Sequence, residues 1–285
     1  MNNEAQGLDI VDYSDRVRIE QDEVSLPLCR RLGALLDLDF DELKRGDELP
    51  FPWTAVLFPG VARQSDIGED GHPLRGDFLP PIALPRRRFA GRSVELVKPL
   101  RIGDPVERRS TITEVTPKEG RNGPMVFVTI RHEINGPAGL AMTEHQQVVY
   151  LGPEQPINRS AVDKAPEKLP EPAWKGSFIA NPVALFRYSA LTFNGHRIHY
   201  DRTYATEVEG YPAMVANGGL TTLLLLEMAR QRLGKSVSSY NVRAVRPLFE
   251  DQTASLYGVA DTEGGLFWAL NPAGELVMKI DIRTQ

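Results

Sequence analysis

The run GGLTTLLLLEMAR at residues 218–230 is the most apolar stretch of the chain with the character of a helix. Its leucines leave only a narrow polar stripe, so nearly the whole circumference of this helix needs a covering surface. A sheet that curls around the helix would supply that surface. Each buried leucine contributes roughly 1.5 to 3 kcal/mol of transfer free energy. The helix body is therefore expected to be core, and only its N-terminus is a candidate site.

Segments rich in β-branched and aromatic residues predict the sheet. Four such segments lie in the first half of the chain, and four more follow the apolar helix, with turn residues between them. A short strand also opens each half, and a helix at 26–38 follows the first of these strands. A long antiparallel sheet with one face covered by an apolar helix is an α+β architecture. The expected strands are 15–23, 92–97, 106–115, 125–134 and 140–151, then 178–186, 238–245, 253–260, 266–270 and 275–282.

A proline-rich segment at 152–173 divides the chain into two similar parts. Its prolines stand among Glu, Lys and Ser with little to bury, which is typical of an extended linker. The predicted domains are 8–151 and 174–285. Within the first, residues 66–84 are rich in Gly, Pro and Asp and predict a long loop, of the length that often has a function.

Composition excludes several classes of function. The 285 residues are 41% hydrophobic and 25% charged, as in ordinary globular proteins, and the formal net charge of -5 argues against a nucleic-acid partner. A single cysteine, Cys29, rules out an internal disulfide and suggests a reducing compartment. No run of about 18 apolar residues predicts a membrane helix. We therefore expect a cytoplasmic protein with no membrane partner.

The sequence FNGHRIHYD at residues 193–201 is the candidate for chemistry. It holds two of the five histidines, His196 and His199, beside an amide and a carboxylate, and it leads into the start of the apolar helix. Unpaired N–H groups at a helix start can bind a carbonyl oxygen held near an imidazole. Asp201 could cap a turn or orient a base. The neighbouring residues supply no further compact ligand set, so no metal is expected.

The motif NGHRIH at 194–199, followed by YD at 200–201 and VANG at 215–218, resembles the hydratase motif of MaoC-like hot dog proteins, the R-specific enoyl-CoA hydratases. The likeness is greatest to fused double hot dog hydratases of mesaconyl-C4-CoA or itaconyl-CoA, whose corresponding run also reads FNxHRIHYD. The segments DGHP at 70–73, FLPP at 78–81 and PRR at 85–87 resemble their N-terminal half.

The resemblance implies a double hot dog fold, with two antiparallel sheets that each wrap a helix. Residues 8–151 would form the dehydratase-like half and 174–285 the half with the motif. The implied activity is a hydro-lyase that adds water reversibly to a short branched dicarboxylic enoyl-CoA and yields citramalyl-CoA. Coenzyme A is then part of the substrate and no separate cofactor is expected. The resemblance leaves a homodimer open.

In this chemistry His199 deprotonates water, Asn194 orients the water, and the Gly218 N–H polarises the thioester carbonyl. The chain departs from the family pattern at two positions. Asn194 stands where most hydratases have a catalytic aspartate, and Asn217 replaces the histidine that usually precedes the helix glycine. Because an amide cannot accept a proton, the role of base falls to His199.

A second carboxylate on the substrate would need a cation, preferably a bidentate arginine. The candidate substrate-binding residues all lie in the second half, and the first half is expected mainly to shape the acyl pocket through the loop at 68–81. Two alternatives stay open: a thioesterase using Asp201 with Gly218, and a non-catalytic acyl-thioester-binding protein, suggested by Asn194. The substrate-binding candidates are Arg187, Arg197, Tyr200, Asn217, Arg243 and Arg246.

Overall fold

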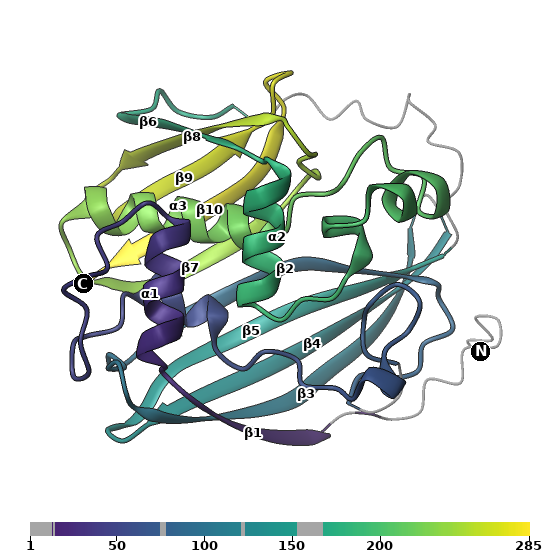
Figure 1. The fold of residues 1–285 in the computed structure, drawn as a ribbon, viewed down its shortest axis with the longest axis horizontal. Coiled ribbons are helices and arrows are strands. Elements are labelled where there is room, and N and C mark those ends of the chain that lie inside the picture. The colour runs from purple at the N-terminus through teal and green to yellow at the C-terminus, as the bar shows by residue number, and fades with distance from the viewer. Residues whose placement is uncertain (1–12, 14, 75–77, 121–122, 153–167) are drawn as a thin grey trace.

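One antiparallel sheet of ten strands dominates the computed structural model, which describes residues 13, 15–74, 78–120, 123–152 and 168–285. The strand order is β1-β3-β4-β5-β2-β7-β10-β9-β8-β6, and every pairing between neighbours is antiparallel. The α+β class is therefore confirmed (Figure 1). The strands are β1 (Val17–Glu23), β2 (Arg86–Leu96), β3 (Pro105–Gly120), β4 (Gly123–Gly136), β5 (Gly139–Leu151), β6 (Trp174–Ile179), β7 (Val237–Ala244), β8 (Thr253–Ala260), β9 (Gly264–Leu270) and β10 (Leu276–Thr284).

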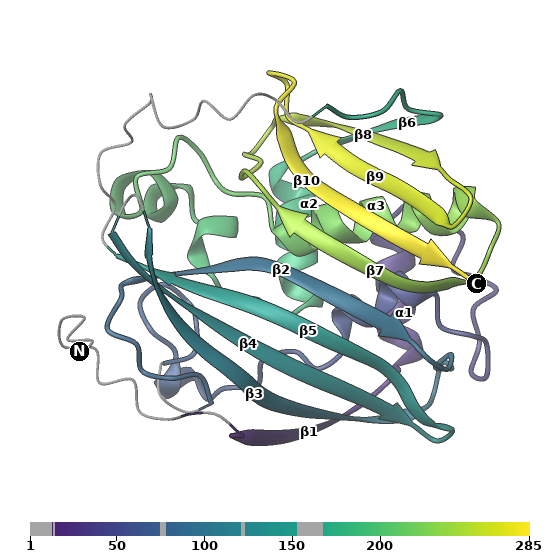
Figure 2. The same cartoon turned by 180° about the vertical axis from the view of Figure 1, so that it is seen from behind.

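The two halves join edge to edge through β2 and β7. Gly91 to Glu95 pair with Arg243 to Ser239, and Figure 2 shows the sheet running without a break across this junction. The sequence predicts two hot dog domains packed sheet to sheet, whereas in the structure the two sheets are joined into one through this pair of strands. A Cβ on Gly91 would lie 2.7 Å from the Val242 carbonyl oxygen, so glycine permits the close approach of the two strands.

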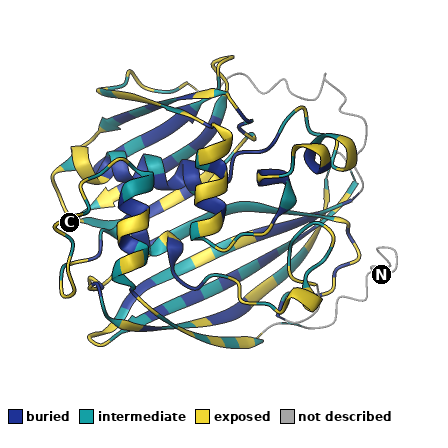
Figure 3. Ribbon diagram, viewed as in Figure 1, coloured by how far each residue is buried: buried dark blue, intermediate teal, exposed yellow. Residues whose placement is uncertain are grey.

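The second-half sheet wraps α3 (Gly218–Leu233), as the apolar run predicts. The helix packs against β7, β8, β9 and β10, and Leu220, Leu223 and Leu225 are almost completely buried. Figure 3 shows the buried colour along most of this helix. Asn217 caps its first turn, and Gly234, with a φ of 62°, ends it in the left-handed conformation that glycine adopts at low cost.

The helices described in the first half are shorter than α3. Its α1 (Leu26–Leu35) lies beside α2 (Pro182–Leu191) of the second half, and a 3₁₀ segment, Phe51–Val56, packs against α3. Within the described residues, no long helix lies across the concave face of β2 to β5. The first-half sheet therefore leaves space that a central helix would fill, and part of it is a cavity described below.

Helix α2 was not predicted, because residues 178–186 were interpreted as a strand. The strand β6 ends at Ile179. Asn181 then accepts a hydrogen bond from the Ala184 N–H at 3.0 Å, and Pro182 occupies the first turn of the helix. An asparagine cap followed by proline is a strong helix start that outweighs the β-forming Val183 and Phe186.

The proposed linker falls mostly outside the described residues, which resume at Lys168. The domain limits 8–151 and 174–285 therefore stay predictions. Among the helices that the structure describes, none has the length and apolar character needed to cross a membrane.

Candidate active site

His199 is a buried imidazole held in one orientation. Its Nδ1 lies 2.7 Å from the Val215 carbonyl oxygen, which can only accept, so Nδ1 carries the proton. The Nε2 atom is then the basic nitrogen, and it has no hydrogen-bond partner within the described chain. Burial lowers the pKa of His199 to about 4, although the bond to Val215 opposes this shift. The side chain is therefore neutral near pH 7 and able to accept a proton.

Asn194 lies in the same loop, and half of its amide is already engaged. Its Oδ1 accepts the His196 backbone N–H at 3.0 Å. Only the amide NH₂ is left to interact with a ligand, so Asn194 can donate to a water oxygen but cannot take its proton. This geometry suits an orienting role.

The start of α3 offers one open backbone donor. The Asn217 side chain accepts the Gly219 N–H at 2.8 Å, which explains why asparagine is acceptable in place of a histidine at this position. The Gly218 N–H has no acceptor among the described residues and is exposed at the cavity surface. An unpaired donor at the positive end of a helix dipole is a suitable partner for a thioester oxygen.

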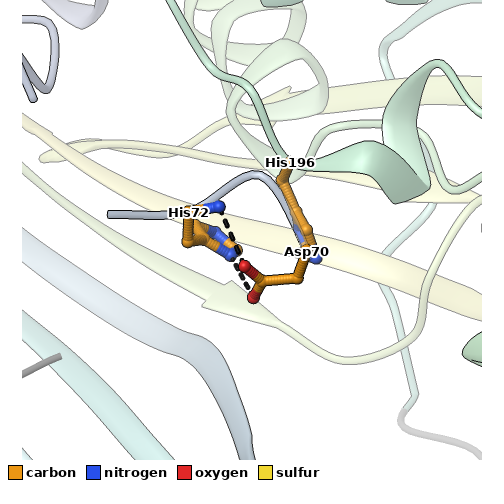
Figure 4. A group of neighbouring side chains, drawn as sticks. All are labelled: Asp70, His72 and His196. Atoms are coloured by element: carbon orange, nitrogen blue, oxygen red, sulfur yellow. Dashed lines mark hydrogen bonds and ion pairs between the residues drawn. The ribbon is translucent and has the colours of Figure 1, made fainter. Parts of the chain in front are cut away.

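A loop of the first half completes the site. The sequence predicts that the loop at 68–81 shapes the acyl pocket, but not that its side chains meet His196. Asp70 bonds His72 through both the backbone N–H, at 2.9 Å, and Nδ1, at 3.0 Å. The His72 ring lies 4.0 Å from the His196 ring, measured between centroids, and His196 in turn makes an edge contact with His199. Figure 4 shows the two bonds between Asp70 and His72, with His196 alongside. Three histidines from two distant loops thus meet.

Two contacts join these loops tightly. The Arg197 N–H donates to the Asp70 carbonyl oxygen at 2.9 Å, and the Arg197 Nη1 donates to the Glu69 carbonyl oxygen at 3.1 Å. Gly71 has a φ of 86°, and a Cβ on it would lie 1.8 Å from the Gly195 carbonyl oxygen. Glycine at 71 is therefore required by both conformation and space.

Two of the three histidines, His196 and His199, have a lowered pKa. Burial, followed by the nearby His72 and His199, lowers the pKa of His196 to about 2. For Asp70, burial acts in the opposite direction, but the hydrogen bonds from His72 dominate and hold its pKa far below the usual range. Asp70 is consequently a carboxylate at any pH near neutrality, close to the neutral ring of His196.

Asp201 and Arg197 are engaged with each other rather than with the cavity. The Asp201 Oδ2 accepts from Arg197 Nε at 3.0 Å and Nη2 at 2.8 Å, while Oδ1 accepts the Tyr204 N–H at 3.0 Å. The Arg197 guanidinium also stacks over the Tyr204 ring. Of the two roles open to Asp201 from the sequence, the structure favours the turn cap.

A cavity of about 1710 Å³ runs past this loop and the start of α3. Tyr200 lines it and donates to the Gly195 carbonyl oxygen at 2.9 Å. The arginines proposed for the substrate carboxylate lie differently: Arg246 lines the cavity, whereas Arg187 and Arg243 are exposed and do not. Of the predicted site residues, the cavity brings together Asn194, His199, Tyr200, Asn217, Gly218 and Arg246.

The described residues do contain one set of side chains that could hold a metal. Ligand atoms of Asp70, His72 and His196 lie within 4.8 Å of one another. The sequence reasoning did not find this set because it considered only residues near His199 in the chain. An ion bound there would have to replace the proton shared by Asp70 and His72. The expectation of no metal stays a prediction.

Comparisons with known proteins place this geometry in a family. A family model described as hydroxyacyl-thioester dehydratase type 2 matches residues 53–250. The mesaconyl-C(4)-CoA hydratase of Chloroflexus aurantiacus is 40% identical over 237 residues, which are 82% of this chain and 83% of that protein. The 3-hydroxyacyl-thioester dehydratase X of Mycobacterium tuberculosis is 28% identical, over 78% of this chain and 74% of its own.

Solved structures show the same fold at low sequence identity. HtdX of Mycobacterium tuberculosis superposes with a TM-score of 0.66 at 18% identity, covering 94% of this chain and 99% of that one. A conserved hypothetical protein from the same organism, described as having a double hot dog fold, gives a TM-score of 0.53 at 14% identity, with 95% and 96% covered. The double hot dog fold is confirmed.

The family match covers more than half of the chain, and its members act on acyl thioesters. A buried neutral histidine, an amide with an unengaged NH₂ and an open helix-start N–H on one cavity are groups that such chemistry uses. The chain therefore belongs to the hydroxyacyl-thioester dehydratase type 2 family of MaoC-like hot dog enzymes, hydro-lyases that add water to acyl thioesters or remove it.

Proposed function

We propose that this enzyme hydrates a short branched dicarboxylic enoyl-CoA, with mesaconyl-C4-CoA as the substrate and citramalyl-CoA as the product. The observation that carries the proposal is the pairing of two open groups on one cavity wall: the unengaged Nε2 of His199 and the unengaged N–H of Gly218. One can accept a proton from water while the other stabilises the enolate-like oxygen that develops on the thioester.

The reaction would proceed in two proton transfers. His199 Nε2 takes a proton from a water molecule held by the Asn194 NH₂, and the oxygen adds to the β-carbon of the enoyl group. Electron density moves onto the thioester oxygen, which the Gly218 N–H binds. The protonated His199 then returns its proton to the α-carbon, which leaves the side chain neutral for the next cycle.

Two arguments support the choice of acyl group: the similarity to a named hydratase and the conjugation of the substrate double bond with the thioester. The Chloroflexus relative is named for mesaconyl-C(4)-CoA, whose double bond is conjugated with the thioester. In itaconyl-CoA the double bond lies one carbon further away, so polarising the thioester carbonyl would not activate it directly. The enolate-stabilising geometry proposed for Gly218 therefore supports mesaconyl-C4-CoA, and itaconyl-CoA is a second substrate to be tested.

Coenzyme A needs cations for its phosphates, and the first half supplies a candidate group. Arg86, Arg87 and Arg88, at the start of β2, all line the cavity. All three are partly exposed, which suits phosphate groups that remain partly in water. The first half would then contribute to substrate binding as well as to the shape of the pocket.

The thioesterase alternative is weakened by the state of Asp201. A hydrolase would need a carboxylate aimed at water, and both Asp201 oxygens are already engaged by Arg197 and the Tyr204 N–H. The non-catalytic alternative is disfavoured by the retained His199, which is oriented, neutral and open at Nε2.

The test is incubation of the purified protein with mesaconyl-C4-CoA, itaconyl-CoA and crotonyl-CoA, followed by mass detection of hydrated product and of free CoA. We expect water addition to mesaconyl-C4-CoA with no release of CoA. Free CoA as the main product would establish hydrolysis instead. No change in any of the three substrates would contradict the proposal.

A further inference from the structure

A second, inner cavity lies next to the active-site cavity, between α3 and the strands of the first half. It has a volume of about 240 Å³ and lies where the first-half sheet lacks a long central helix. Arg92, Gln146, Tyr188 and Gly219 line both cavities, so the inner cavity is a direct neighbour of the outer one. An acyl group whose thioester lies at the helix start would therefore face Arg92 and Tyr188.

Arg92 is a cation that the described protein satisfies poorly. Its nearest anion is Glu144, whose two oxygens lie 3.4 and 3.5 Å from Nη1. The Nε atom is closed to water and has no partner among the described residues, and no hydrogen bond to Nη2 exists within them. By contrast, Arg108 binds Glu20 through two nitrogens at 2.7 and 3.1 Å. Buried polar groups are normally paired, so the unpaired donors of Arg92 need an explanation.

Arg92 keeps its positive charge although most of its side chain is buried. Burial alone would lower the pKa of Arg92, but the attraction of the Glu144 carboxylate opposes it, and the pKa is raised. An ionised guanidinium is a planar hydrogen-bond donor that suits a carboxylate, and Arg92 lines both cavities.

Tyr188 supplies a third donor near the reacting carbons. Its hydroxyl lies against the start of α3, because a Cβ on Gly219 would fall 2.4 Å from it. Burial raises the pKa of Tyr188 to about 12, so the hydroxyl stays protonated. It makes no hydrogen bond to the described residues.

We propose that Arg92, assisted by the Tyr188 hydroxyl, binds the carboxylate that the substrate carries on its acyl group and thereby selects dicarboxylic over simple enoyl thioesters. This assignment rests on the proposed hydratase function. It differs from the expectation drawn from the sequence, which considered arginines of the second half alone. In mesaconyl-C4-CoA the carboxylate sits on the carbon that receives water, so its partner must lie beside the reacting carbon rather than at the cavity mouth.

The remaining arginines fit this task less well. Arg197 is taken by Asp201 and by the Glu69 carbonyl oxygen. Arg246 lines the outer cavity and lies 3.5 Å from Glu275 and 3.4 Å from the Leu276 carbonyl oxygen. Arg246 does not line the inner cavity.

The experiment compares two substrates that differ only at the carboxylate. In 3-methylcrotonyl-CoA, a methyl group replaces the carboxylate of mesaconyl-C4-CoA. For wild type and for each variant, kcat/KM is measured for both, and the ratio of the two values reports selectivity. Where turnover of the methyl analogue is too slow to follow, its inhibition constant replaces kcat/KM. The ratio is insensitive to the fraction of protein that is folded.

We expect Arg92→Gln to lower the ratio by about 10²-fold or more, because a carboxylate left without its charged partner binds poorly in a closed site. Arg92→Lys keeps the charge but not the planar pair of donors, so a smaller fall of about 10-fold is expected. Tyr188→Phe should lower the ratio by several-fold, the usual effect of one hydrogen bond.

Two controls keep the result decisive. Because Arg92→Gln leaves Glu144 without its cation, the double variant Arg92→Gln with Glu144→Gln removes both charges, and it should show the same fall in the ratio. Arg246→Gln should change kcat/KM for both substrates alike and leave the ratio unaltered. A ratio that stays at the wild-type value in every Arg92 variant, or that falls only in Arg246→Gln, would overturn the assignment.

Failure of the proposed function gives a different result. A wild-type enzyme that hydrates neither mesaconyl-C4-CoA nor itaconyl-CoA would refute the hydratase proposal itself. A wild-type enzyme that prefers the dicarboxylic substrate, together with Arg92 variants that keep this preference, would refute only the carboxylate site.

Discussion

Replacing His199 by alanine tests both the proposed base and its buried environment. A positioned general base contributes about 10²- to 10⁴-fold to the rate. We therefore expect kcat for mesaconyl-C4-CoA to fall by that factor in His199→Ala while the fold is retained, as judged by circular dichroism. The His199 pKa of about 4 further predicts that wild-type activity holds from neutral pH down to about 4 and then declines, as the base becomes protonated.

The same substitution has a stability signature with a definite sign. In the unfolded chain His199 protonates below its ordinary pKa of 6.5, whereas in the folded protein it stays neutral to about 4. The unfolded state thus binds more protons between these values, and the wild-type free energy of unfolding falls as pH decreases through that window. At 1.36 kcal/mol per pKa unit, this depressed pKa removes about 3 kcal/mol by pH 4.

The alanine variant escapes that acid-induced loss but lacks the hydrogen bond from Nδ1 to the Val215 carbonyl oxygen. Leaving this buried acceptor unpaired costs about 1–3 kcal/mol at pH 7. The variant should therefore be less stable than wild type at pH 7, and the difference should shrink or reverse toward pH 4. Urea unfolding at several pH values measures it. A kcat near the wild-type value, or a stability difference that does not change with pH, would refute this account of His199.

Three further predictions concern the neighbouring loops. Asn194→Ala should reduce kcat less than His199→Ala does, because it removes an orienting donor worth about 0.5–1.5 kcal/mol, whereas Asn194→Asp should raise the His199 pKa and move the acid limb of the pH–rate profile upward. Gly71→Ala should cost more than about 2 kcal/mol of stability and most activity, since its Cβ would clash with the Gly195 carbonyl oxygen. The control for backbone strain alone is Gly46→Ala, because Gly46 has a φ of 91° and open space around it. Equal losses of stability in the two variants, measured by thermal unfolding, would contradict the clash. Activity should survive dialysis against a chelator, and a loss that Zn²⁺ restores would instead assign a metal to the side chains of Figure 4.

The elements most accessible from the sequence were those with strong local signals. The apolar run predicts a helix from residue 219 to 233, and the structure has one from 218 to 233. Alternating strands separated by glycine turns were also found, although β2 begins at Arg86 rather than at 92. In these cases the order of apolar and polar residues within one segment is enough to predict which of its side chains are buried. The short helix α2 was not predicted, because its β-forming side chains outnumber the two residues that mark a helix start, Asn181 and Pro182.

The candidate site was only partly predictable, for a different reason. His199, Asn194 and Gly218 follow one another closely enough for a local motif to connect them. His72 joins them only because two loops more than a hundred residues apart meet at Gly71 and Gly195. Arg92 was overlooked because it lies in a strand of the first half, and its open donors depend on how the two halves enclose a cavity. Contacts of this kind have no signature in a single sequence.

The shared ladder between β2 and β7 has a consequence for how the chain reaches its folded state. During synthesis the first half emerges first, and β2 then has its partner β5 on one side and an unsatisfied edge of backbone donors and acceptors on the other. Exposed strand edges of this kind invite pairing with other chains. That edge stays open until β7 has left the ribosome, and β7 ends 93 residues after the end of β5 (Leu151 to Ala244). The nascent chain is thus most prone to aggregate in that interval, and a recombinant fragment that stops before β7 would carry the same open edge permanently.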